Sequence, residues 1–354
     1  MTMTPDYSTM DAALEMVLKA GPDLSNGFTS HASMGAEAMC AMGRADAVLA
    51  WVENYRHMFT DRPRPSQKID PLRWRDALGA ANRFADWVVF FREELKAQPW
   101  PDVIRRWGAL LSPGLVGAAT HGIIRAGHAV RALSQQKTPN RLAELAEGLA
   151  YWAATYEELP EKRTPVAIGL PSRAINAVPV LQVPRRGHFH TIVDALVQLD
   201  DFPPFAEAIS LVETSGSAAA FISDLTDTFA RVYLTNAHDI ITTIAFIHSV
   251  DAPAALRHIS ACLDTGGVRE GLSFAWQASA SLYSIYGVKP PQPESAAPVT
   301  SDAEELFQSA IDAGDEHAIK FTEVCLREHS MNPEPSYLEA ARHAIGVLKV
   351  VGRV

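Results

Sequence analysis

The chain has 354 residues, of which 47% are hydrophobic and 20% are charged, a composition typical of folded globular proteins and unlike that of disordered or fibrous chains. Acidic residues outnumber basic ones by 41 to 31, and no Lys/Arg cluster alternates with aromatic residues. The net charge of −10 therefore argues against nucleic acid and anionic membranes as partners. No apolar run reaches the roughly 18–20 residues of a membrane-spanning helix, and no secretory signal is visible, so we expect a cytoplasmic protein.

Apolar residues recur with the 3.6-residue period of amphipathic helices along most of the chain, and few stretches alternate with the period of two that is typical of strands. The pattern predicts an all-α protein, folded as an irregular multi-helix bundle without a fixed internal repeat. In chain order, the predicted helices cover residues 9–20, 33–43, 45–58, 71–80, 82–97, 101–110, 114–134, 140–157, 188–199, 202–213, 217–235, 238–249, 252–263, 268–285, 302–313, 316–329 and 335–349. Asp251 ahead of Pro253 predicts a helix start, and Gly314 predicts a left-handed helix end.

Two proline-containing stretches interrupt the helices. Residues 159–187 hold five prolines and cannot form a continuous helix, so we expect a long irregular crossing that is either a lid or a connection. Trp152 and Tyr156 come just before it and make it a candidate pocket lid. Residues 287–301 are predicted to form a surface loop. We expect one helical domain over residues 1–354.

Standard catalytic signatures are absent from the sequence. It has no GxGxxG after a strand, no GxxxxGK[ST], no HExxH and no GxSxG, which disfavours dinucleotide-binding dehydrogenases, P-loop enzymes, common zinc proteases and α/β-hydrolases. Cys40, Cys262 and Cys325 lie far apart and are odd in number, so they predict reduced thiols rather than disulfides or a zinc knuckle. The twelve histidines are the residues that stand out, because histidine is the commonest metal ligand and acid–base group.

One helix carries three polar side chains on one face among small and apolar residues. His121, Arg125 and His128 follow one another at helical spacing in LVGAATHGIIRAGHAVRAL. Such a polar row must be satisfied by hydrogen bonds, water or a bound ion. For a single histidine, a bond to a backbone carbonyl is the simpler interpretation.

Three further segments place a histidine in a suggestive position. His248 follows apolar residues at helical spacing and faces the core, while His31 lies at or before a helix start among small residues. His317 and Lys320 are three residues apart in DEHAIKF. By itself, Lys320 is better explained as a solvated surface partner of Glu316 or Glu323.

Taken together in their order, four motifs resemble the questin oxidase-like family. They are Ser30–Arg44 (SHxxMxxEAxxxxGR), Pro113–Leu133 (PGLVGxxxHGxIRxxHAxRAL), Phe246–Arg257 (FIHSVDAPAALR) and Asp315–Phe321 (DEHAIKF). They span most of the chain, from about residue 25 to 349. The resemblance implies a mostly helical fold and an oxidative cleavage of anthraquinone-type rings in polyketide metabolism.

The resemblance also implies a mononuclear Fe(II) held by His31, His121, His248 and His317 and by a CO2-derived carbamate on Lys320. A carbamate makes chemical sense in this role, since an ammonium has no lone pair whereas a carbamate offers anionic oxygens. Fungal members often have a second histidine four residues after the position of His121, where this chain has Arg125. This departure leaves the substrate open.

The leading hypothesis is therefore an iron-dependent oxygenase that uses O2 on an aromatic or quinone-like substrate. Arg125 is predicted to hold a phenolate or carboxylate of the substrate, and His128 to act as an acid or base or to orient His121. No motif indicates NADPH, so the sequence leaves the need for a nicotinamide reductant open, together with the oligomeric state. The alternatives are a non-catalytic helical protein that binds an apolar aromatic ligand, and a binuclear metal hydrolase with a carbamylated lysine.

Overall fold

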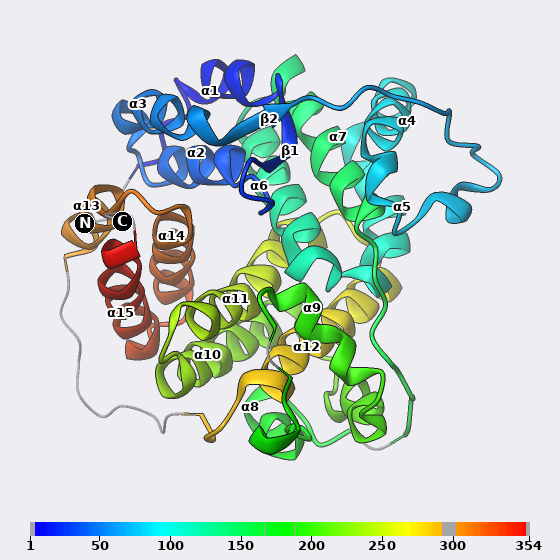
Figure 1. Ribbon diagram of the computed structural model, residues 1–354, viewed down its shortest axis with the longest axis vertical. Coiled ribbons are helices and arrows are strands. Elements are labelled where there is room, and N and C mark those ends of the chain that lie inside the picture. Colours follow the sequence, from blue (N-terminus) through cyan, green and yellow to red (C-terminus); the bar gives the residue numbers. More distant parts are fainter. Residues whose placement is uncertain (1–3, 166, 188, 292–301, 352–354) are drawn as a thin grey trace.

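The computed structural model describes residues 4–165, 167–187, 189–291 and 302–351, and these residues are mostly helical (Figure 1), which confirms the predicted all-α class. The α-helices are α1 Met10–Val17, α2 Ala32–Ala41, α3 Ala45–Tyr55, α4 Phe84–Ala97, α5 Trp100–Leu111, α6 His121–Gln135, α7 Pro139–Ala154, α8 Pro171–Ala174, α9 Ile192–Leu196, α10 Ala218–Asn236, α11 Ile240–Ser260, α12 Thr265–Tyr286, α13 Ala303–Ala313, α14 Glu316–Met331 and α15 Pro335–Val351. Short 3₁₀ turns are Arg56–Met58, Trp74–Ala77, Ala81–Arg83, Ser112–Gly114, Gly117–Thr120, Ile175–Ala177, Val183–Arg185, Val197–Leu199 and Pro203–Leu211.

One small sheet, which the sequence did not predict, lies beside the N-terminal helices. β1 (Ala20–Leu24) and β2 (Phe59–Asp61) pair antiparallel, with Ala20 opposite Asp61 and Leu24 opposite Phe59. A further isolated bridge joins Asp23 to Thr29. The strand pair holds the start of the loop between β1 and α2, and the bridge to Thr29 holds this loop near its end, just before His31.

Four helices that are far apart in the sequence meet near the centre of Figure 1. α2 packs against α6 and α14, and α11 packs against the same two helices. Glycines allow the closest approaches: an added Cβ at Gly122 would lie 2.5 Å from the Cα of Trp152 on α7. An added Cβ at Gly127 would lie 2.8 Å from the Cβ of Ala255 on α11. The small residues of this part of the sequence therefore bring α6 close to two neighbours.

The predicted helix start at Asp251 is wrong, because α11 runs without interruption from residue 240 to residue 260. Pro253 lies inside it and leaves the carbonyl of Ser249 without its usual amide donor. The hydroxyl of Ser279 on α12 donates to that carbonyl at 2.8 Å, so tertiary packing replaces the lost helical bond. The predicted left-handed end at Gly314 is confirmed, with φ +76° at the end of α13.

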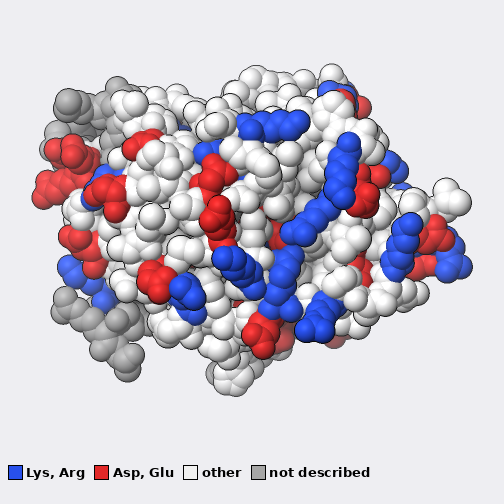
Figure 2. Space-filling model, turned by 90° about the horizontal axis from the view of Figure 1, so that it is seen from above, with Lys and Arg blue, Asp and Glu red and all other residues white. Residues whose placement is uncertain are grey.

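The irregular crossing 159–187 is confirmed, since its described residues hold only the short helix α8 and two 3₁₀ turns. The predicted helices 71–80 and 202–213 contain 3₁₀ turns instead of α-helix. Of the predicted loop 287–301, residues 292–301 lie outside the described residues. Among the described helices, none has the length and apolarity that crossing a membrane requires. Figure 2 shows basic and acidic side chains next to one another over one face of the molecule.

Candidate metal centre

Four histidines from distant parts of the sequence converge where α2, α6, α11 and α14 meet. His31 directly precedes α2, His121 is the first residue of α6, His317 lies in the first turn of α14, and His248 lies in the middle of α11. Each is buried, and one ring nitrogen of each lies within 4.8 Å of the others. This spacing is compatible with four imidazoles around one metal ion.

A left-handed turn ahead of α6 sets the position of His121. Ala118, Ala119 and Thr120 have φ of +46°, +54° and +72°, although none of them is glycine. An L-residue in this region costs roughly 1–2 kcal/mol, so the turn stores strain. It brings the carbonyl of Ala118 to Nδ1 of His121, which donates to it. Nε2 of His121 is thereby left unprotonated and faces Nε2 of His31 at 2.5 Å.

Acidic residues face the outer nitrogens of two other histidines. Nδ1 of His31 lies 3.4 Å from Glu316, and Nδ1 of His317 lies 3.6 Å from Asp315. Both ring nitrogens of His248 are buried and have no hydrogen-bond partner among the described residues. An unpaired buried imidazole is costly, and ligation of a cation would satisfy it. The donor set therefore fits a metal ion.

Burial and nearby groups keep the imidazoles of His31, His121 and His248 neutral, which is the form that binds metals. Burial and the nearby Lys320 charge lower the pKa of His121 to about 3. Burial also lowers the pKa of His31, as do Lys320 and the neighbouring histidines, and burial next to His121 and His317 lowers that of His248. Free electron pairs are therefore available at neutral pH.

Lys320 lies one helical turn beyond His317 and is fully buried, so its interpretation as a solvated surface residue is wrong. Its Nζ has no hydrogen-bond partner among the described residues, and the nearest carboxylate oxygen, on Asp251, lies 3.9 Å away. Both carboxylate oxygens of Asp251 also lack partners there. Burial lowers the pKa of Lys320 against the pull of Asp251 and Glu316, and burial raises the pKa of Asp251 to about 6.

The histidine cluster opens into a cavity of about 610 Å³. Its apolar walls come from the loop before α2, the turn before α6, α9 and the start of α11. The apolar lining residues are Phe28, Ala118, Ala119, Ile192, Val193, Ile240, Ile241 and Ile244. The acidic lining residues are Asp23, Asp194, Asp315 and Glu316. The buried imidazole nitrogens at one wall of this cavity could therefore hold a metal ion beside a space for an apolar ligand.

A family model described as questin oxidase-like matches residues 28–325, which is most of the chain and includes all four histidines and Lys320. The chain belongs to the questin oxidase-like family. No curated protein matches it. The resemblance inferred from the four motifs is thereby confirmed.

In this questin oxidase-like chain, the other two residues of the polar row on α6 point away from the pocket. Arg125 forms a buried two-pronged ion pair with Glu144 of α7, at 2.6 and 2.9 Å, and does not line the cavity. His128 lies 2.6 Å from the carboxylate of Glu37 and does not line the cavity either. The backbone of Ala118, not His128, orients His121. These contacts depend on the neighbouring helices α7 and α2, which the pattern of residues along one helix does not reveal.

None of the described residues of the crossing 159–187 lines the pocket either. Trp152 is buried, and its indole donates to the carbonyl of Gly114. Instead, residues 190–194, just before and at the start of α9, line the cavity. Proline content located an irregular segment correctly, but it could not show which segment of the chain lines the pocket.

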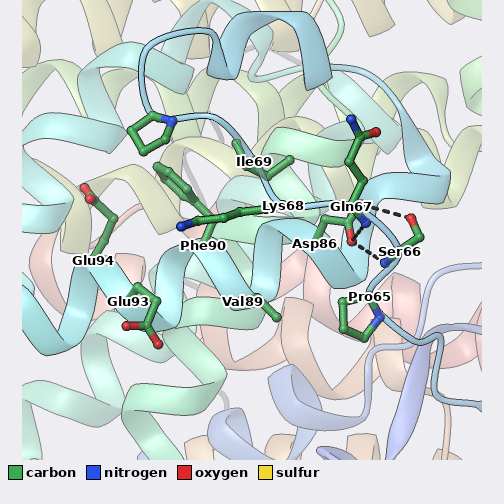
Figure 3. A pocket seen from close by; sticks show the side chains of 11 residues that line it. Pro65, Ser66, Gln67, Lys68, Ile69, Asp86, Val89, Phe90, Glu93 and Glu94 are labelled. Atoms are coloured by element: carbon green, nitrogen blue, oxygen red, sulfur yellow. Dashed lines mark hydrogen bonds between the residues drawn. The ribbon is translucent and has the colours of Figure 1, made fainter.

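A second cavity, of about 650 Å³, lies beside the start of α4 (Figure 3). Asp86 points to the preceding loop, where it accepts hydrogen bonds from the backbone of Ser66 and Gln67. It is also paired with Arg83, and Glu94 accepts from the indole of Trp107. Asp86 and Glu94 are therefore already engaged in contacts within the protein.

Proposed function

We propose that this protein is an iron-dependent oxygenase that oxidises or cleaves an aromatic, quinone-like substrate with O2. The observation that carries the proposal is the cluster of four buried histidines at the wall of an apolar cavity, in a chain of the questin oxidase-like family. Imidazoles with an anionic oxygen ligand suit Fe(II), and an apolar cavity suits a planar aromatic ring.

In this proposal His31, His121, His248 and His317 hold one Fe(II), which supplies the activation of O2. The protein contributes orientation: the carbonyl of Ala118 fixes the tautomer of His121. The apolar walls keep water away from the substrate and the metal.

Lys320 is the proposed fifth ligand, as a carbamate. Forming it requires a neutral amine, whose nitrogen bonds to CO2 and releases one proton. Burial lowers the lysine pKa, and the absence of a hydrogen-bond partner for Nζ among the described residues leaves the amine free to react. The new carboxylate would then supply the anionic oxygen that the four imidazoles lack.

The first experiment is metal analysis by plasma mass spectrometry of untagged protein purified under nitrogen. We expect about one iron per chain in the native protein and a loss of iron in His121→Ala and Lys320→Ala, both with native helical circular dichroism. His57→Ala is the matched control, because this exposed histidine bonds only to the carbonyl of Asn54 among its described contacts. Retention of iron in His121→Ala would contradict the ligand assignment.

Two further readouts separate the finer parts of the proposal. A carbamate carbon signal after exchange into 13C-bicarbonate, absent in Lys320→Ala, tests the modification. Oxygen uptake with quinone and hydroquinone compounds, with and without NADPH, tests the reaction: insertion of both oxygen atoms needs no reductant, whereas insertion of one atom and reduction of the other to water needs two electrons.

Metal stoichiometry also tests the alternatives. Asp315, Glu316 and His317 bring a second set of ligand atoms within 4.8 Å of one another. Two metal ions per chain would therefore favour a binuclear hydrolase. No stoichiometric metal would favour a binding protein for an apolar aromatic ligand.

A further inference from the structure

Part of the pocket wall is a hydrogen-bonded trio of side chains that the metal centre does not use. Tyr151, on α7, is 5% exposed, and its hydroxyl donates to the carboxylate of Asp23 on β1 at 3.1 Å. The hydroxyl of Thr29 lies 2.7 Å from the same tyrosine oxygen. All three residues line the cavity that contains the histidines.

The direction of these bonds follows from the number of protons. A tyrosine hydroxyl has one proton, and Tyr151 uses it toward Asp23, so Thr29 must be the donor to Tyr151. The oxygens of the trio then keep free lone pairs but no free proton. The trio can therefore accept a hydrogen bond from a ligand and cannot donate one.

The charges around the cavity point in the same direction. Among the described residues that line it there is no Lys or Arg, and His190 is the one histidine outside the cluster. Burial raises the pKa of both Tyr151 and Asp23, and the positive charge of Arg125 opposes this effect. Its guanidinium donates to Glu144, however, and does not line the cavity. In the protein without metal, a carboxylate on a ligand would meet acidic residues without a Lys or Arg to pair with.

We propose that Tyr151, held by Thr29 and Asp23, accepts a hydrogen bond from a hydroxyl group of an uncharged aromatic substrate and makes the pocket discriminate against the carboxylated analogue. This inference rests on the proposed function for its substrate ring. It replaces the predicted role of Arg125, since recognition then depends on hydrogen-bond acceptors instead of a cation.

The test is a titration of the full chain, iron-loaded and chelator-treated, under nitrogen, with 2-naphthol, naphthalene and 2-naphthoate. We expect the native protein to prefer 2-naphthol to both other compounds. Tyr151→Phe should weaken 2-naphthol binding by about five- to tenfold, the value of one hydrogen bond, and leave naphthalene binding unchanged. Asp23→Asn should reduce the difference in affinity between 2-naphthol and 2-naphthoate. Tyr283→Phe is the control, because that hydroxyl donates to the carbonyl of Lys289 away from the cavity.

Equal or tighter binding of 2-naphthoate by the chelator-treated native protein would overturn the inference. So would an equal loss of naphthalene and 2-naphthol binding in Tyr151→Phe, which would mean that Tyr151 acts only in packing. Iron content is measured on the same samples. If the purified native protein contains no iron and prefers 2-naphthol, only the oxygenase proposal is contradicted. If it contains iron but its chelator-treated form lacks this preference, only the role of the trio is contradicted.

Discussion

Replacing Gly127 by Ala tests whether the close contact between α6 and α11 sets the geometry of the histidines. The new Cβ would lie 2.8 Å from the Cβ of Ala255 and 2.9 Å from its carbonyl oxygen. Nonbonded carbons normally lie about 3.5–4.0 Å apart, so roughly 1 Å of space is missing. Both atoms belong to or adjoin the backbone of α11 and cannot rotate away. The helices must therefore separate, at an expected cost of about 1–3 kcal/mol in the free energy of unfolding.

The same separation moves His121 on α6 away from His248 on α11. Because metal ligands must keep their distances to within about 0.2 Å, we expect Gly127→Ala to bind iron more weakly as well. Urea unfolding of the metal-free protein and a competition titration with a chelator measure the two effects separately. The matched control is Gly346→Ala on α15, where a Cβ meets nothing within 4 Å and should stabilise by about 0.5–1 kcal/mol. If both variants were equally stabilised, the contact between α6 and α11 would not be as close as described.

Three further predictions concern buried charges and backbone strain. Arg125→Met leaves Glu144 buried without its ion-pair partner and should lower the free energy of unfolding in urea by about 3–5 kcal/mol. Adding Glu144→Leu should recover most of this loss. No recovery would mean that Arg125 stabilises the fold through contacts other than Glu144. Ala119→Gly relieves a positive φ and should be neutral or stabilising, whereas Ala50→Gly in exposed helix should cost about 0.5–1 kcal/mol; similar losses would contradict the left-handed turn. Burial raises the pKa of Glu37, but the contacts with Arg131 and His128 outweigh this effect and hold the pKa below the ordinary value of 4.5. The ionised carboxylate therefore stabilises the fold above about pH 4.5, and this stabilisation is lost as the pH falls. The stability gap between native protein and Glu37→Gln should therefore shrink below about pH 4.5, and a gap independent of pH would refute this assignment.

The structure explains why some sequence predictions failed. Asp251 and Pro253 have the local pattern of a helix start, but α11 continues because Ser279 from another helix satisfies the carbonyl that the proline leaves open. Lys320 has acidic neighbours at helical spacing, yet it is buried because α14 packs against α2 and α11. Local spacing carries no information about such partners.

The candidate site divides in the same way. The histidines could be named from the sequence because each lies in a recognisable motif, and their ordered set identifies the family. The trio of Asp23, Thr29 and Tyr151 was missed, because Tyr151 lies more than a hundred positions from the other two and such common polar residues give no signal in a single sequence. The strained turn at Ala118 was missed for a related reason: alanine favours helix, and only its surroundings hold it in the left-handed region.

The sequence by itself determined the helical class, most helix positions and the histidines that converge, because periodicity and motifs are local properties of the chain. The tertiary structure decided which side chains face the pocket. Arg125 and His128 share a helix face with His121, but neighbouring helices present Glu144 and Glu37 to them and pair them away from the cavity. A buried charge takes the partner that packing brings within reach, and that partner comes from another part of the chain.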